Sequence, residues 1–146
     1  MTTYYARSSK EPRVYQKARE VSCKVFEVSK AFPKGETYSL TDQIRRASQS
    51  VGAQIAEAWG KRRYEKHIVS KLTDADAEQL ETQHWVGEAL DCGYISETDA
   101  RQLYSDLEEI GRMLNSMMEK SDSFCDSPNG QLREPTTEYF TSSTDH

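Results

Sequence analysis

Hydrophobic residues recur along most of the chain at alternating intervals of three and four positions, with polar residues between them. This spacing gathers the hydrophobic side chains on one face of an α-helix, whereas a half-buried strand would alternate every second residue. The pattern predicts four helices, at about 12–32, 39–60, 67–92 and 96–120, and no strand. A polar residue, Gln79, lies on the predicted buried face of the third helix.

Proline, serine and glycine mark the expected ends of these helices. Pro12 suits a first turn, and the ring of Pro33 disfavours helical geometry at the residue before it, where the first helix should end. Ser39 and Ser96 are predicted N-caps, and Gly93 is a predicted left-handed C-cap. Because the connections are short, neighbouring helices must run antiparallel, which predicts an all-α, up-down-up-down four-helix bundle.

The 146 residues have the usual size of one domain with one hydrophobic core. We expect a four-helix bundle domain at 12–120, preceded by a flexible N-terminal arm at 1–11. Residues 121–146 are rich in Ser, Thr, Asp and Pro without a sustained period, which predicts a polar, disordered tail. Tyr139 and Phe140 are the tail residues that could dock it on the bundle.

The net charge of −5 is unevenly distributed along the chain. Residues 1–87 hold 15 Lys and Arg against 11 Asp and Glu, a balance of +4, whereas residues 88–146 hold 4 against 13, a balance of −9. This excludes a uniformly basic nucleic-acid-binding module but leaves room for a local basic patch.

Apolar runs are only a few residues long, and the N-terminus lacks the apolar region of a secretory signal. We therefore expect a cytoplasmic protein that has no contact with a membrane. Cys23, Cys92 and Cys125 are odd in number, widely spaced and without a CxxC pattern, which predicts free thiols.

Motifs of known catalytic and cofactor sites, such as GxGxxG, the P-loop, HExxH and GxSxG, do not occur in the sequence. His67, His84 and His146 fall at no spacing that makes a metal site. A di-metal bundle repeats a Glu-x-x-His pair on two helices, and Glu81 with His84 is the single such pair here. We therefore expect no metal, no cofactor and no conventional enzyme activity.

The densest charge lies between the second and third predicted helices, in GKRRYEKHIVSK. Five cations against the carboxylate of Glu65 give a local charge of +4, and Tyr64 lies among them as a ring on which a base could stack. The segment is either a phosphate-binding site for RNA or DNA or a solvated turn between two helices. The five cations, here named the basic turn, are Lys61, Arg62, Arg63, Lys66 and Lys71.

The same segment offers a further hypothesis, because Arg62 and His67 have an Arg-x-x-x-x-His spacing. This resembles the motif of HEPN-type ribonucleases, helical proteins in which Arg and His act at a phosphodiester. Arg63 stands where that family usually carries a small polar residue such as Asn. A ribonuclease is accordingly the least favoured hypothesis for this chain.

A second stripe, displaced from the core stripe by about a quarter turn, follows the second and third helices. A tryptophan flanked by carboxylates outside the core is typical of a polar subunit interface. The alternative is a solvated face on which the tryptophan covers the edge of its own core. This set, here named the polar stripe, comprises Gln43, Arg46, Ser50, Glu57, Glu78, Glu81 and Trp85, with Asp74 on the same face.

The segments FPKGETYSLTDQIRRASQSVGAQIAEAWGKRR and AEQLETQHWVGEALDCGYIS resemble the "four helix bundle protein" family, which includes intervening-sequence proteins encoded within large ribosomal RNA genes. The accessory variability determinant of diversity-generating retroelements is similar too. The resemblance covers about Val14–Glu119 and joins the FP turn, L-x-x-Q-x-R-R-A, I-A-E and L-E-T in order. The matching residues are Phe32, Pro33, Leu40, Gln43, Arg45, Arg46, Ala47, Ser50, Ile55, Ala56, Glu57, Leu80, Glu81 and Thr82.

The resemblance implies a homopentameric ring. Through the retroelement accessory proteins, it also implies binding of nucleic acid and of a reverse transcriptase by a basic surface. The expectation is a non-enzymatic, homo-oligomeric scaffold or accessory protein whose partners are its own copies and RNA, DNA or a reverse-transcriptase-like protein. The acidic net charge favours the alternative, a protein-only interaction module without nucleic-acid binding.

Overall fold

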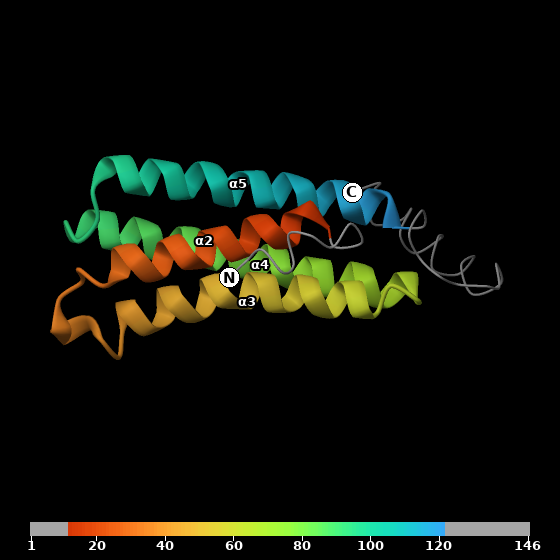
Figure 1. Ribbon diagram of the computed structural model, residues 1–146, viewed down its shortest axis with the longest axis horizontal. Helices are drawn as coiled ribbons and strands as arrows, with labels where there is room; N and C mark the ends of the chain where they lie inside the picture. The colour runs from red at the N-terminus through yellow and green to blue at the C-terminus, as the bar shows by residue number, and fades with distance from the viewer. Residues whose placement is uncertain (1–11, 122–146) are drawn as a thin grey trace.

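The computed structural model describes residues 12–121, which form four α-helices and one short 3₁₀ helix and contain no strand. The helices lie side by side in an elongated bundle, and consecutive helices run in opposite directions (Figure 1). The predicted all-α four-helix bundle is therefore confirmed. The elements are α2 (Arg13–Ser29), η1 (Lys34–Glu36), α3 (Leu40–Gly60), α4 (Glu65–Asp91) and α5 (Glu97–Glu119).

The end of the first helix differs from the prediction. α2 ends at Ser29, although Pro33 led us to expect an end at Phe32. The amides of residues 30–32 bond to carbonyls three positions back, as in a 3₁₀ turn, so the chain tightens before it reaches the proline.

The predicted caps have different outcomes. Ser96 is confirmed as the N-cap of α5, because its Oγ accepts a bond of 3.1 Å from the amide of Asp99. Gly93 is confirmed as a left-handed cap, with φ +77°. The prediction for Ser39 was wrong: its hydroxyl donates to Oε1 of Glu36 at 2.6 Å and makes no cap bond to α3.

One hydrophobic core runs along the bundle between the helices. Gln79 is confirmed in it, at 4% exposure. Its amide is satisfied within α4, because Nε2 donates to Oδ1 of Asp76 at 2.9 Å and Oε1 accepts from Nε2 of Gln83 at 2.8 Å. The largest fully buried side chains include Ile44, Ile55, Ile68, Leu72, Leu103, Leu107, Ile110 and Leu114.

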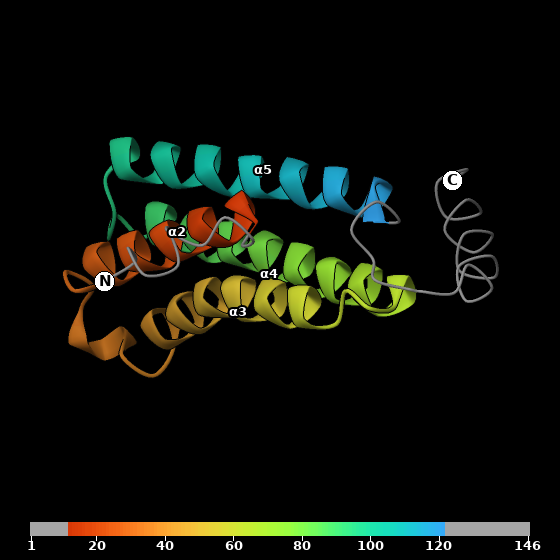
Figure 2. The ribbon, with the colours of Figure 1, turned by 45° about the vertical axis from the view of Figure 1, so that its right-hand side comes forward.

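The two ends of the bundle are closed by different contacts. At one end, the hydroxyl of Tyr94 donates to Oε2 of Glu36 at 3.0 Å and joins the α4–α5 connection to η1. At the other end, the α3–α4 turn lies near the end of α5 (Figure 2). There the hydroxyl of Ser121 donates to Oε2 of Glu65 at 3.0 Å. The α3–α4 turn is the segment that carries the basic turn.

Several predictions fall outside residues 12–121: the arm at 1–11, nearly all of the tail with Tyr139 and Phe140, and also Cys125 and His146. Cys23 and Cys92 lie within the described part, where both are exposed free thiols. None of the described helices has the length and apolar composition needed to cross a membrane.

Candidate functional site

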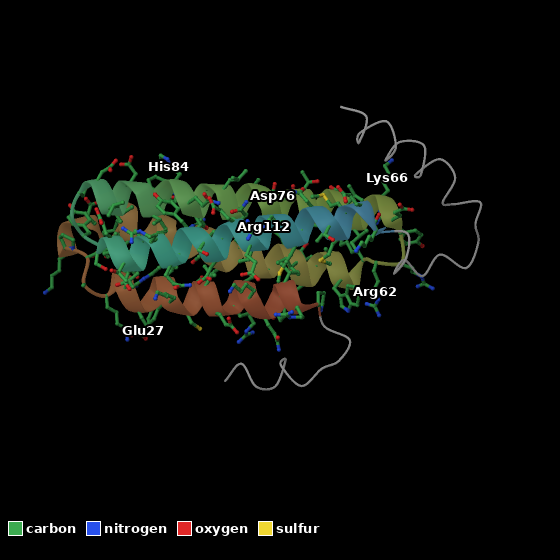
Figure 3. The ribbon with its side chains drawn as sticks, turned by 90° about the horizontal axis from the view of Figure 1, so that it is seen from above. Glu27, Arg62, Lys66, Asp76, His84 and Arg112 are labelled. Carbon is green, nitrogen blue, oxygen red and sulfur yellow. The ribbon has the colours of Figure 1, made fainter. Side chains whose placement is uncertain are left out.

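The basic turn begins where α3 ends at Gly60 and continues into the first turns of α4. The amide of Lys61 bonds to the carbonyls of Glu57 and Ala58, so the turn is hydrogen-bonded directly to α3. Figure 3 shows Arg62 and Lys66 at the same end of the bundle but projecting in different directions. These two cations therefore face different sides of this end of the molecule.

Three cations of the basic turn are free to meet a ligand. Lys61, Arg63 and Lys66 are exposed. No ion pair joins any of the three to a carboxylate within residues 12–121. These three side chains, here named the open cations, are the part of the basic turn best placed to contact phosphate.

Arg62 is engaged by the helix that precedes it. Its Nη1 donates to the carbonyl of Trp59 at 2.8 Å, and its guanidinium carbon lies 4.6 Å from the centroid of the Trp59 ring. A cation at the last carbonyls of a helix complements the negative end of the helix dipole. Arg62 therefore acts first as a cap on α3.

Lys71 is separated from the open cations by its partners. Its Nζ lies 3.0 Å from Oε1 of Glu57 and 3.9 Å from Oδ2 of Asp74, and it donates to Oε1 of Gln54 at 3.4 Å. The contacts with Glu57 and Gln54 join α4 to α3, and the carboxylates of Glu57 and Asp74 offset the lysine charge locally. The spacing along the chain grouped Lys71 with the basic turn, whereas the fold places it against the polar stripe.

The one carboxylate of the segment faces inward. Glu65 is 5% exposed, with Oε2 bonded to Ser121, while Oε1 is buried and has no hydrogen-bond partner in the described part of the chain. Sequence reasoning counted Glu65 as a surface charge. The spacing of Glu65 from Ile68 and Leu72, at three and seven positions, was the signal that would have placed it on the core face.

An aromatic pair lies among the open cations. The ring centroids of Tyr64 and His67 are 5.4 Å apart in an edge-on arrangement with an interplanar angle of 62°. Tyr64 is 47% exposed. An aromatic ring therefore reaches the surface between Arg63 and Lys66 in the chain.

The ribonuclease hypothesis required Arg62 and His67 to act on one phosphodiester. The guanidinium of Arg62 packs on Trp59, whereas the imidazole of His67 packs on Tyr64. No hydrogen bond or ring contact joins the two side chains among the described residues. The structure thus assigns the two residues to separate local pairs.

The polar stripe lies along the α3–α4 face. Trp85 packs partly against the core and donates from Nε1 to Oε2 of Glu81 at 3.1 Å. Burial raises the pKa of the Glu78 carboxyl, and the nearby charges of Glu81 and Asp74 raise it further. Trp85 covers the edge of the core, as the solvated-face interpretation predicts. It is also only half-buried, which leaves part of the indole for the subunit interface of the other interpretation. Arg46, Glu57 and Glu81 are exposed, whereas Gln43, Ser50, Glu78 and Trp85 are half-buried.

Sequence reasoning missed a groove between α2 and α3. Its volume is about 290 Å³, and Gly52 lets the two helices approach, since a Cβ there would lie 3.9 Å from that of Ala18. Its lining is mainly small side chains together with Tyr15, Arg19 and Gln49.

No group of three His, Cys, Asp or Glu residues able to hold a metal ion occurs within residues 12–121.

Comparisons with known proteins agree with this architecture. A family model described as "23S rRNA-intervening sequence protein" matches residues 10–116. A crystal structure from Bacteroides thetaiotaomicron, described as a protein with unknown function from the S23 ribosomal protein family, is similar, with a TM-score of 0.68 and 25% identity. The match covers 75% of this chain and 98% of that chain. No curated protein matches the chain.

Proposed function

The chain belongs to the 23S rRNA-intervening sequence protein family, and from that premise we propose that it is a non-enzymatic accessory protein that binds RNA or DNA through the basic turn. One observation carries the proposal. The three open cations stand at one end of the bundle without carboxylate partners in the described chain, while the single carboxylate of the turn is buried. The exposed charge of the α3–α4 turn is therefore positive although the chain is acidic.

The chemistry of this site suits phosphates. Lys61, Arg63 and Lys66 present ammonium and guanidinium groups that neutralise phosphate oxygens and release counterions. Three such contacts per subunit give a slope of log K against log salt of about −2 to −3. Binding through phosphates carries little sequence preference, so the proposed partner is a nucleic acid recognised by its backbone.

The proposal includes a homo-oligomer, most simply the ring of five that the family resemblance implies. A single subunit with three open cations binds weakly, but repeated sites on one assembly act together through effective concentration. The polar stripe supplies the candidate contact surface, because it combines exposed charges of both signs with the half-buried indole of Trp85.

The second candidate function is a protein-only interaction module. The observation that favours it is the balance of −9 over residues 88–146, which include the whole of α5. The acidic residues of α5 repel nucleic acid and attract basic protein surfaces. The two candidates differ in one measurable property, namely whether the isolated protein binds nucleic acid at low salt.

The test is fluorescence anisotropy with labelled RNA and DNA at low and physiological salt. The key variant changes Lys61, Arg63 and Lys66 together to Glu. A matched control changes Lys30, Lys34 and Arg101 to Glu, since these exposed residues lie toward the opposite end and the shift in net charge is the same.

We expect salt-sensitive binding by the wild type, loss of binding in the key variant, and affinity within about twofold of wild type in the control. Absence of binding by the wild type at low salt, or equal binding by the key variant, would overturn the proposal and leave the protein-only module as the better explanation.

A further inference from the structure

We infer that the basic turn selects single-stranded or unpaired RNA or DNA, with Tyr64 as the platform on which an exposed base stacks. This inference rests on the proposed nucleic-acid binding and adds the class of ligand. Bases inside a duplex have both faces stacked on their neighbours, so only an unpaired base can offer a free face to a protein ring.

Tyr64 differs from the other exposed aromatic rings in its surroundings. The described chain exposes three large aromatic side chains, Phe26, Tyr38 and Tyr64. The ring of Phe26 already has Lys30 and Arg45 over it, at 5.1 and 4.6 Å from its centroid. Tyr38 lies in the η1–α3 connection, outside the segment that carries the open cations. Of the three large aromatic side chains that residues 12–121 expose, Tyr64 alone lies in the segment that carries the open cations.

The ring of Tyr64 is partly open to solvent. Its one described ring neighbour, His67, meets it edge-on at a centroid distance of 5.4 Å. A contact of this geometry occupies at most one face of the tyrosine ring. The side chain is 47% exposed, so part of the ring is available for a base to stack on.

The backbone holds Tyr64 in place before any ligand arrives. Its amide bonds to the carbonyl of Lys61 at 3.1 Å, and its own carbonyl accepts from the amides of His67 and Ile68 at 3.0 and 3.2 Å. A ring on a backbone fixed in this way loses little conformational entropy on binding. His67 acts as a positioning residue that restricts the ring from one side.

The combination matches the way proteins hold single strands. Arg63 directly precedes Tyr64 in the chain, Lys66 lies two positions after it, and both cations are exposed, so the phosphates of a strand whose base stacks on the ring have cations within a few residues of that ring. A duplex would meet the same cations through its backbone but would leave the ring unused. A single strand should therefore bind more tightly than a duplex, and the difference in affinity is the contribution of one stacked base.

The test compares one sequence as a single strand and as a duplex, with wild type, Tyr64→Ala, Tyr64→Phe and Tyr38→Ala. Tyr38 is 93% exposed and toward the other end of the bundle, so Tyr38→Ala controls for loss of any surface tyrosine. We expect Tyr64→Ala to weaken single-strand binding by roughly 5-fold to 100-fold. Tyr64→Phe and Tyr38→Ala should stay within about twofold of wild type, and duplex binding should not change.

A 2-aminopurine base in the single strand gives a second readout. Its fluorescence should be quenched on binding to wild type and to Tyr64→Phe but not to Tyr64→Ala. One result would overturn this inference and preserve the proposed function. In it, the wild type binds single strand and duplex equally well, Tyr64→Ala changes neither affinity, and the Lys61, Arg63 and Lys66 variant binds neither form. Failure of the wild type to bind either form would overturn both.

Discussion

The hydroxyl of Ser121 donates a hydrogen bond of 3.0 Å to Oε2 of Glu65, and both side chains are buried. The bond joins the first turn of α4 to the residues that follow α5, which are 56 positions apart in the chain. It also anchors the segment that carries the open cations. A buried carboxylate is costly unless it is hydrogen-bonded, so this contact should matter more than a surface bond.

Ser121→Ala is expected to lower the free energy of unfolding by about 1 to 3 kcal/mol, because it leaves the Glu65 carboxylate without its described donor. Urea denaturation measures the loss. Glu65→Gln provides the control, because a neutral amide keeps an acceptor for Ser121 and is less costly to bury than a carboxylate. Ser121→Ala should therefore lower the free energy of unfolding by less in the Glu65→Gln background than in the wild type. Equal unfolding midpoints for Ser121→Ala and wild type would contradict the proposed anchor.

Gly111→Ala should destabilise the bundle by about 1 kcal/mol although alanine favours helices. A Cβ at Gly111 of α5 would lie 2.9 Å from Nε2 of Gln79, which is held by Asp76 and cannot move without losing that bond. Gly60→Ala is the matched control, because nothing lies within 4 Å of its Cβ position and the change should stabilise α3 slightly. The midpoint of thermal unfolding should fall in Gly111→Ala and rise slightly in Gly60→Ala. A higher midpoint in both variants would refute the close contact at Gly111.

The periodicity of hydrophobic residues predicted the helices well, because the spacing of these residues along the chain determines which face of a helix is buried. The position of Gln79 in the core follows from the same rule. The cap at Ser39 could not be predicted in this way, since its hydroxyl had two local choices and the η1 geometry placed Oε1 of Glu36 within 2.6 Å.

The candidate site was predicted only in part. The density of cations identified the α3–α4 turn, but the ion pair of Lys71 with Glu57 depends on how α4 is rotated against α3. That rotation is a property of helix packing, which a single sequence does not specify residue by residue. The burial of Glu65 was within reach of the periodicity, and was missed because a charged residue was assumed to lie on the surface.

Glu78→Gln should stabilise the protein at neutral pH, by less than about 1 kcal/mol given its partial exposure. Burial and the charges of Glu81 and Asp74 raise the Glu78 pKa above 4.5, so its ionised form costs stability above the folded-state pKa. The cost disappears as pH falls through that pKa, and below 4.5 the carboxyl is mostly protonated in both states. Unfolding curves at pH 7 and pH 4 check this, and a gain that persists at pH 4 would exclude an electrostatic origin.

We expect the purified protein to leave a structured RNA intact. Arg62 and His67 are engaged by Trp59 and Tyr64 respectively, so neither is poised with the other for acid–base chemistry at one phosphate. The measurement is gel analysis of RNA incubated with wild type and with His67→Ala. Cleavage by the wild type that His67→Ala abolishes would establish a ribonuclease and displace the accessory-protein proposal.

The oligomer should depend on the polar stripe. Arg46 is exposed on α3, and Trp85 presents the unburied part of its indole on α4 beside the Glu81 carboxylate. The change of Arg46 to Glu would convert an attractive charge into a repulsive one, and Trp85→Ala would remove the aromatic anchor. Light scattering at micromolar concentration should therefore report an oligomer, most simply a pentamer, for the wild type and a monomer for the double variant.

Two comparisons separate an interface effect from a loss of folding. Lys30→Glu combined with Tyr38→Ala makes the same kinds of change outside the polar stripe and should leave the oligomer intact. Trp85 also packs against the core, so Arg46→Glu alone, which changes an exposed side chain, should weaken assembly in the same direction while helicity stays constant. A monomeric wild type, or an oligomer that survives both stripe variants, would remove the polar stripe as the contact surface. The avidity argument for nucleic-acid binding would then fail with it, because three open cations on one acidic subunit give only a weak site.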